Sequence, residues 1–322
     1  MKHILVAASL LLCALLTFSA AARPAPDGGK RQSASKAPVR RQTTLYGAVG
    51  RGPGTDRGEL ITINQTTGDG TSLGPGASDP AVGITGLAFD VSGDLFASTI
   101  NDIVFGGQPV STLVRLDPVT GGQLALVGTI RLADGTPVVI NDLAVQPGTD
   151  LLYGTSLRLD NFTNDIYTIS KVTAVATFVG NTGVTGATLA FAPDGTLYMT
   201  SAEFTPEGVF IRGFLNTIDP ATGAVLTTSA PFTEAHVGGL AVRPTDGVIF
   251  ASGGFPSDVY TLSPGGDLTF LGLTGFGGLG DVAFTPLPTS KEDCADGSWA
   301  RFDFPFQFKS QGDCIQFVNT GK

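Results

Sequence analysis

The chain has 322 residues, of which 42% are hydrophobic, and a formal net charge of −9. This length suits one large repeat domain with short appendages, and the negative charge disfavours binding to the phosphates of nucleic acid. The chain contains two histidines, one of them at position 3, so a metal site built from several histidines is excluded.

The N-terminal residues 1–22 have the organisation of a secretory signal peptide. Lys2 precedes an apolar run from Ile4 to Phe18, and small residues follow as far as Ala22. The run is shorter than the roughly 20 residues that span a bilayer, so we expect cleavage and no transmembrane segment. Residues 23–42 are rich in Pro, Gly, Ser and basic residues, which predicts a disordered basic linker. We therefore expect the protein to be secreted or to reside at the cell surface or in the periplasm.

Residues 84–130 contain four short apolar runs, each ended by Gly, Pro, Asp or Asn, which is typical of four antiparallel strands. The opening run, G-L-A-F, recurs with variations at intervals of about 40–55 residues, and periods of this size indicate a β-propeller. Five such opening strands are found: Gly86–Phe89, Asp142–Val145, Thr188–Phe191, Gly239–Val242 and Asp281–Phe284.

The two ends of the repeat region complete each other. Thr43–Val49 resembles the second strand of the repeat but has no opening strand before it, whereas Asp281–Phe284 is an opening strand without partners. One blade is thus expected to combine both ends and close the ring, which removes an open sheet edge. We predict an all-β fold, a propeller of five blades of four antiparallel strands over residues 43–288. By length alone, six blades of about 40 residues are an alternative.

Small residues are expected where the innermost strands converge. Alanine occupies the third position of all five opening strands, and large aromatic residues occupy the second strands farther out. The alanines are Ala88, Ala144, Ala190, Ala241 and Ala283, and the aromatic residues are Phe96, Tyr153, Tyr198 and Phe250.

Connections within the repeats are of two kinds. Turns between the first and second strands and between the third and fourth are short and rich in Asp, Pro and Gly, which suits tight hairpins. The other connections are long and unlike one another, and they share the opposite face of the ring, where binding surfaces are usually found. Asp- and Gly-rich segments also raise calcium as an alternative, but turn chemistry suffices, and we expect no cofactor.

Residues 289–322 form a separate C-terminal segment. It contains Cys294 and Cys314, the two cysteines left after removal of the signal peptide, and an even count in an exported chain predicts a disulfide. Four phenylalanines alternate with other residues and would share one face of a strand, which we expect to pack on the propeller flank: Phe302, Phe304, Phe306 and Phe308.

Five residues on the loop-rich face are candidates for ligand binding. Three of them open strands that point toward the central channel, and the other two lie on neighbouring connections. Converging oxygens with one imidazole could bind a hard cation or a sugar. Alternatively, an Asp at the start of a strand caps backbone N–H groups. The candidates are Asn141, Asp142, Glu203, His236 and Asp281.

Two resemblances add to this interpretation. The C-terminal segment resembles a short motif of exported bacterial proteins, which implies export but no reaction; the matching residues are Cys294, Gly297, Trp299, Phe302, Gln311, Gly312, Asp313, Cys314 and Ile315. The repeats, with Asp117–Gly121 and Asp219–Gly223, are similar to secreted bacterial propellers of the quinoprotein-like and lactonase-like groups. No metal ligands of the lactonase-like group are carried over.

The function expected from the sequence is ligand binding without catalysis. A Ser-His-Asp triad would have to use His236, and the chain has no G-x-S-x-G motif. We expect a monomer that binds a glycan or a cell-envelope or protein partner on its loop-rich face. The alternative is a lactonase-like or glycan-cleaving enzyme that uses carboxylates at the mouth of the central channel.

Overall fold

The computed structural model describes residues 43–50, 56–76, 82–101, 110–158, 160–186, 188–254, 257–288, 290–297, 299 and 308–320. The expected signal peptide and linker lie outside these residues, as do Phe302, Phe304 and Phe306. Within the described ranges no helix has the length and hydrophobicity that crossing a membrane requires.

Twenty strands form five antiparallel sheets of four strands each, so the predicted five-bladed β-propeller is confirmed and the six-bladed alternative is wrong. The first blade contains β20 (Leu279–Phe284), β1 (Leu45–Val49), β2 (Leu60–Ile63) and β3 (Gly70–Gly74). The second contains β4 (Val82–Phe89), β5 (Leu95–Asn101), β6 (Ser111–Leu116) and β7 (Gln123–Thr129). The third contains β8 (Asp142–Val145), β9 (Leu152–Leu157), β10 (Asn164–Ile169) and β11 (Ala176–Asn181). The fourth contains β12 (Ala190–Phe191), β13 (Leu197–Phe204), β14 (Phe210–Ile218) and β15 (Val225–Thr228). The fifth contains β16 (Val237–Val242), β17 (Ile249–Gly253), β18 (Asp258–Leu262) and β19 (Leu268–Leu273).

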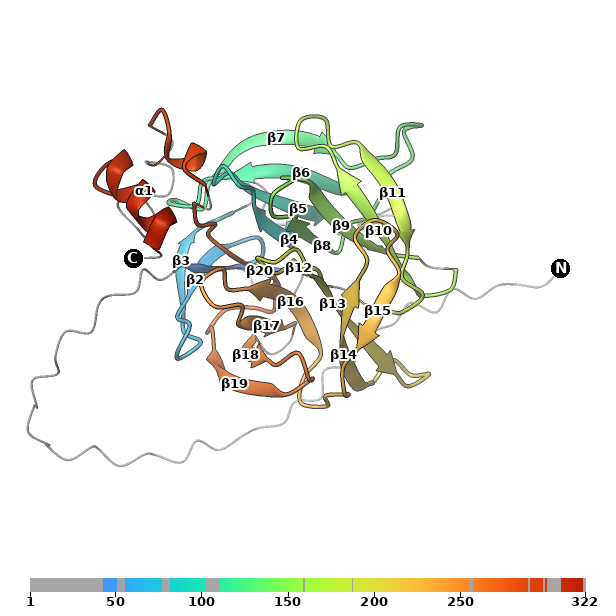
Figure 1. The fold of residues 1–322 in the computed structure, drawn as a ribbon. Coiled ribbons are helices and arrows are strands. Elements are labelled where there is room, and N and C mark those ends of the chain that lie inside the picture. Colours follow the sequence, from blue (N-terminus) through green and yellow to red (C-terminus); the bar gives the residue numbers. More distant parts are fainter. Residues whose placement is uncertain are drawn as a thin grey trace, which may run out of the picture. The chain divides into compact units, whose positions relative to one another are not determined.

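The inner strands β20, β4, β8, β12 and β16 surround the centre, and each lies beside the next around the ring (Figure 1). The fourth strands, β3, β7, β11, β15 and β19, lie at the periphery. We call the end of the ring where the inner strands start the loop face, and the end where they stop, at Phe89, Val145, Phe191, Val242 and Phe284, the turn face.

The ring closes as the sequence predicts. β1 pairs with β20 in antiparallel register, with Leu45 opposite Phe284 and Ala48 opposite Asp281. The N–H of Thr285 donates to the carbonyl oxygen of Thr44 at 3.1 Å, which extends the pairing beyond the strands. Residues from the two ends of the repeat region therefore form one blade.

Packing between blades follows the predicted change from small to large residues. Each inner alanine is buried and lies opposite an aromatic residue on the second strand, as Ala283 does opposite Tyr46. Apolar clusters fill the space between neighbouring blades; Tyr46, for example, packs edge-to-face on Phe89 of the second blade, with ring centroids 5.1 Å apart. The Tyr46 hydroxyl also donates to the carbonyl oxygen of Pro118 at 3.2 Å. Apolar contacts and hydrogen bonds together hold adjacent blades in place.

Side-chain bonds to the backbone stabilise the short turns. In the turn after β6, Asp117 accepts hydrogen bonds from the N–H of Val119 and the hydroxyl of Thr120, both at 2.8 Å, and Gly121 has a φ of 69°. These are the roles expected of Asp and Gly in a tight turn.

The C-terminal segment contains the predicted disulfide, Cys294–Cys314, with Cα atoms 5.7 Å apart. A 3-10 turn, η1 (Glu292–Cys294), and a helix, α1 (Gln311–Thr320), carry the two cysteines. The hydroxyl of Ser310 accepts the N–H of Asp313 at 3.2 Å, and Asp313 in turn accepts the N–H of Lys309 at 3.0 Å, so a reciprocal cap starts the helix.

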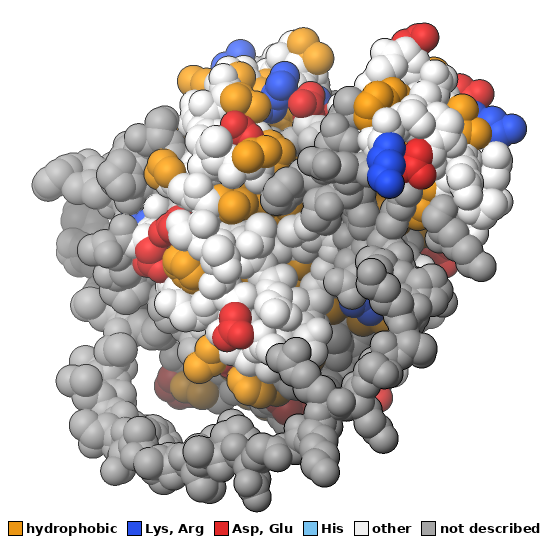
Figure 2. Space-filling model, turned by 90° about the vertical axis from the view of Figure 1, so that its left-hand side faces the viewer, with side chains coloured by type: hydrophobic (Ala, Val, Ile, Leu, Met, Phe, Trp, Pro, Cys, Tyr) orange, Lys and Arg blue, Asp and Glu red, His pale blue; other side chains and the backbone are white. Residues whose placement is uncertain are grey.

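Figure 2 shows one side of the molecule. On this side the hydrophobic side chains of the described residues occur in small groups among polar and charged ones.

Candidate functional site

The inner strands place two of the candidate residues, Asp142 and Asp281, at the centre of the ring. Asp142 begins β8, Asp281 lies in β20, and neither is exposed to solvent. The two side chains are hydrogen-bonded to each other. We call them the hub carboxyl pair. The sequence predicts that both side chains face the mouth of the central channel on the loop face. In the structure both side chains are fully buried, so neither is exposed at the mouth.

The hub carboxyl pair binds the backbone of all five blades. At one level of the ring, each inner strand presents an N–H to the two carboxyl groups. Asp281 accepts those of Leu87 at 2.6 Å and Val282 at 2.7 Å, and also that of Leu240. Asp142 accepts those of Leu143 at 2.5 Å and Leu189 at 2.9 Å. Each inner strand pairs with another strand on one side only, so its N–H groups that face the centre have no strand partner. The two carboxyl groups accept these buried N–H groups.

Two glycines provide space for this arrangement. A Cβ on Gly86 would lie 2.6 Å from the nitrogen of Leu143, and one on Gly239 would lie 2.7 Å from the Cα of Asp281. Both positions correspond in the repeat to the aspartates themselves. In four of the five inner strands this position therefore carries either a buried aspartate or a glycine that leaves room for its neighbours.

Burial raises the pKa of both hub carboxyl groups, because the charged form loses its hydration. The pKa of Asp142 is raised well above its usual value, first by burial and then by the charge of Asp281. Burial raises the pKa of Asp281 to about 7, against the opposing effect of its hydrogen bonds from Asp142 and from the backbone N–H groups of Leu87, Val282 and Leu240. The hydrogen bond between the two carboxyl groups requires that at least one of them be protonated, which the raised pKa values favour.

The hub carboxyl pair has the properties of a structural element. Both carboxyl groups are inaccessible to solvent and accept hydrogen bonds from backbone N–H groups. Neither is therefore placed to act as a nucleophile or to transfer a proton to a substrate. The described residues contain no group of three or more His, Cys, Asp or Glu side chains that could hold a metal ion.

Asn141, which directly precedes Asp142, and Glu203 have partners outside the hub carboxyl pair. Asn141 accepts the N–H of Leu157 at 3.0 Å through its side-chain oxygen, at the end of β9. Glu203 lies on the β13–β14 hairpin and pairs with Arg212 through two hydrogen bonds of 2.8 and 3.2 Å. The structure therefore does not gather the five predicted residues into one site.

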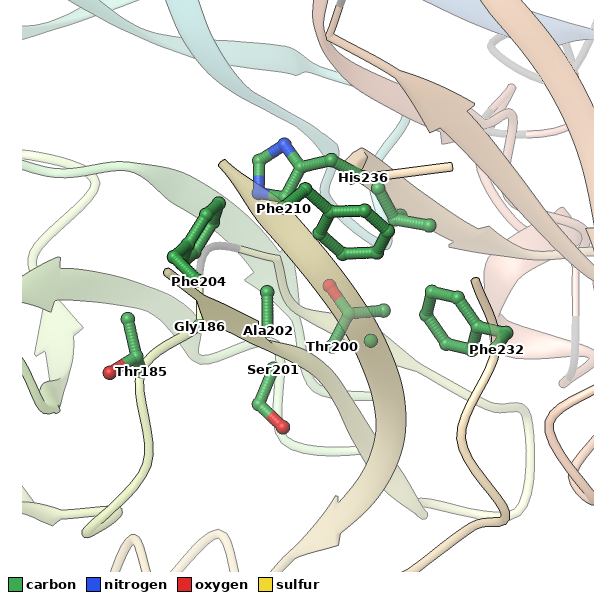
Figure 3. Close-up of a pocket in the computed structure, with 11 residues that line it drawn as sticks. Thr185, Gly186, Thr200, Ser201, Ala202, Phe204, Phe210, Phe232 and His236 are labelled. Carbon is green, nitrogen blue, oxygen red and sulfur yellow. The ribbon is translucent and has the colours of Figure 1, made fainter. Parts of the chain in front are cut away.

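His236 lies in a small pocket on the loop face, with a volume of about 40 Å³. Its ring packs against those of Phe204 and Phe210, with centroids 5.4 and 5.8 Å away, and this apolar surrounding lowers its pKa. Figure 3 shows these three rings gathered at one end of the pocket, with Phe232 at the other. Thr185, Thr200 and Ser201 also line the pocket.

The three phenylalanines of this pocket are not among the residues predicted from the sequence, which are all polar. The feature of the sequence that could have indicated them is their position at long connections. Phe204 and Phe210 flank one such connection, and Phe232 lies in another. Aromatic residues placed on variable connections are more typical of binding surfaces than of turns.

No family model and no curated protein matches this chain. Among solved structures, the chain is similar to a PQQ-bound aldose sugar dehydrogenase from Streptomyces coelicolor, at 15% identity over 77% of this chain and 90% of that one, with a TM-score of 0.45. It is also similar to TolB from Acinetobacter baumannii (13% identity, 76% and 67% coverage, TM-score 0.43). A chain of a nidogen–laminin complex matches at 14% identity, with 76% and 98% coverage and a TM-score of 0.43. Matches at this level assign no function to the chain.

Proposed function

We propose that this chain is an exported, non-enzymatic β-propeller that binds a protein partner, such as a component of the cell envelope, through its loop face. The observation that carries the proposal is the exposed apolar surface of the β13–β14 hairpin beside the His236 pocket. The disulfide suits an oxidising compartment outside the cytoplasm.

The apolar surface consists of Phe204, Val209 and Ile211, which are 41%, 61% and 45% exposed. Phe162, on the connection after β9, is 61% exposed, and its carbonyl oxygen accepts the hydroxyl of Thr185, which lines the pocket. Of these side chains Phe204 lines the pocket, and the others are exposed on the same hairpin or on a connection bonded to the pocket wall. Exposed large apolar side chains of this kind suit a partner that covers them. We call these four residues the hairpin patch.

An enzymatic function is less well supported by the same geometry. The lactonase-like or glycan-cleaving alternative needs carboxylates at an accessible channel mouth, whereas the hub carboxyl pair is fully buried and bonded to backbone N–H groups. Glu203 is accessible, but it is paired with Arg212. A glycan as ligand is kept as an outcome of the test below.

The first prediction concerns the hairpin patch. Val209→Ser with Ile211→Ser should reduce binding of the purified mature protein to isolated envelopes of the source organism by at least about tenfold, because apolar anchors dominate such interfaces. Binding is measured by co-sedimentation, and a photo-crosslinking residue at position 209 should yield a discrete protein adduct.

The matched control is Leu124→Ser with Leu126→Ser, which removes two leucines of β7 that are 57% and 63% exposed. This variant should bind like the wild type. Equal binding by all three proteins would refute the role of the hairpin patch. A glycan-array signal lost with the Val209 and Ile211 substitutions, without a protein adduct, would replace the protein partner by a glycan.

A further inference from the structure

The turn face carries a second and larger pocket, which opens at the centre of the ring and has a volume of about 610 Å³. Volumes of 300–1,000 Å³ are typical of sites for small organic ligands. The pocket lies at the opposite end of the inner strands from the hairpin patch, so it is independent of the function proposed above.

All five blades contribute equivalent residues to its wall. Three successive positions of each inner strand line the pocket: Leu87–Phe89, Leu143–Val145, Leu189–Phe191, Leu240–Val242 and Val282–Phe284. The middle residue is alanine in every case, which leaves space where the strands converge. The hub carboxyl pair is absent from the lining and has no exposed surface, so the wall beside the hub is apolar.

Aromatic rings and prolines surround this space farther out. Phe89, Phe191 and Phe284 end three of the inner strands, and each is held by an edge contact from an aromatic residue of the preceding blade, as Phe191 is by Tyr153 at 5.2 Å. Pro147, Pro193 and Pro244, from the turns of three blades, also line the pocket, as do Pro286–Pro288 after β20 and Phe317 of α1. Rings fixed by packing and turns fixed by proline make a preformed cavity.

The charged side chains in the lining indicate which kind of apolar ligand the pocket favours. The described lining residues include three acidic side chains, Asp90, Asp194 and Asp293, and no Lys, Arg or His. Asp194 is exposed, and its bond from the N–H of Thr196 lowers its pKa, so it is ionised at neutral pH. Asp90 is neutralised in part by Lys171, at 2.9 Å. The ionised carboxylate of Asp194 in the lining repels anions and attracts cations.

We propose that this pocket binds a small lipophilic cation, a molecule with a hydrocarbon or aromatic body and one positively charged nitrogen. The body fills the space between the inner strands, and the nitrogen lies near the phenylalanine rings and the carboxylate of Asp194. Both groups attract a cation, the rings through their negative faces and the carboxylate through its charge.

The second prediction tests this site with alkyl chains of equal length and different head groups. Decyltrimethylammonium, decanol and decanoate are each titrated, below their aggregation concentrations, into the purified mature protein and followed by calorimetry. The cation should bind with one saturable site and at least about tenfold more tightly than decanoate, with decanol between the two.

Two variants locate the binding. Val145→Trp fills the pocket from β8 and should abolish saturable binding, whereas Val172→Trp, at a residue that is 84% exposed and does not line the pocket, should leave it unchanged. Asp194→Asn should weaken the cation several-fold and leave decanol unaffected, whereas Asp134→Asn, on an exposed loop elsewhere, should change neither. Circular dichroism confirms that each variant is folded.

The proposal is overturned if the cation shows no saturable binding to the wild type, if Val145→Trp binds it as well as the wild type does, or if decanoate binds as tightly as the cation.

Discussion

At the scale of single residues, Asp142 and Asp281 are the side chains on which the centre of the molecule depends. In the unfolded chain each is an ordinary carboxylate, whereas in the folded protein each is buried and accepts N–H groups from its own strand and from a neighbouring blade. An aspartate at the start of a strand suggested either a ligand site or a backbone cap, and the structure has the geometry of a cap.

The third prediction follows from these bonds. Asp142→Ala leaves the N–H groups of Leu143 and Leu189 buried without acceptors, and each costs about 1–3 kcal/mol. The free energy of unfolding, measured by urea denaturation at pH 6, should therefore fall by about 2–6 kcal/mol, and Asp281→Ala should have a similar effect. Asp134→Ala, at an exposed loop position, serves as the control. A near-wild-type stability of both hub variants would show that these carboxyl groups serve a ligand instead.

The fourth prediction is a decrease in stability with rising pH. The pKa of each hub carboxyl is higher in the folded protein than the value of about 4 in the unfolded chain, so the folded state binds more protons between the two values. The resulting stabilisation is fully present below pH 4 and is lost as the pH rises through the raised pKa values, of which that of Asp281 is about 7. His236, whose pKa is lowered, acts in the opposite direction near its ordinary value of about 6.5.

The measurement is the free energy of unfolding at several pH values from 5 to 8. The wild type should lose stability over this range, and Asp281→Asn, which cannot ionise, should show a smaller slope. A His236→Asn background removes the opposing contribution. A wild-type stability that rises over the range in that background would contradict the raised pKa values.

At the scale of elements, the repeats and the C-terminal segment differ in how far the sequence predicted them. The inner strands were recognisable because alanine and turn residues recur at equivalent positions, so five blades, their order and the shared blade could be predicted. Helix α1 was not predicted, although Ser310 and Asp313 have the spacing of a capping box, because the alternating phenylalanines before it suggested a strand. The disulfide was predicted from the cysteine count alone.

The fifth prediction concerns this segment. Trp299 is the only tryptophan of the chain and packs beside Cys294, Phe308 and Cys314, so its fluorescence reports on the C-terminal segment alone. Cys294→Ser with Cys314→Ser removes a crosslink worth about 3 kcal/mol for a loop of this size. The emission of Trp299 should shift to the red, while the β-sheet signal in circular dichroism and its melting temperature change little. A parallel loss of both signals would mean that the propeller depends on the disulfide.

At the scale of the whole molecule, the ring separates two kinds of surface. On the loop face the chain places unlike connections, the His236 pocket and the hairpin patch. On the turn face it places four similar turns and the residues that follow β20 around one apolar pocket. The sequence indicated the first surface through its variable connections. It did not reveal the second, because apolar residues within inner strands have the same pattern whether they fill the interior or line a cavity.

The pairing of β1 with β20 also governs when the protein can fold. The two strands lie more than 230 residues apart, so the first blade remains incomplete until almost the whole chain has been synthesised. β1 can pair early with β2, which follows it closely in the chain, whereas its contact with β20 is distant in sequence and forms slowly. The ring therefore reaches its final topology only when β20 has paired with β1.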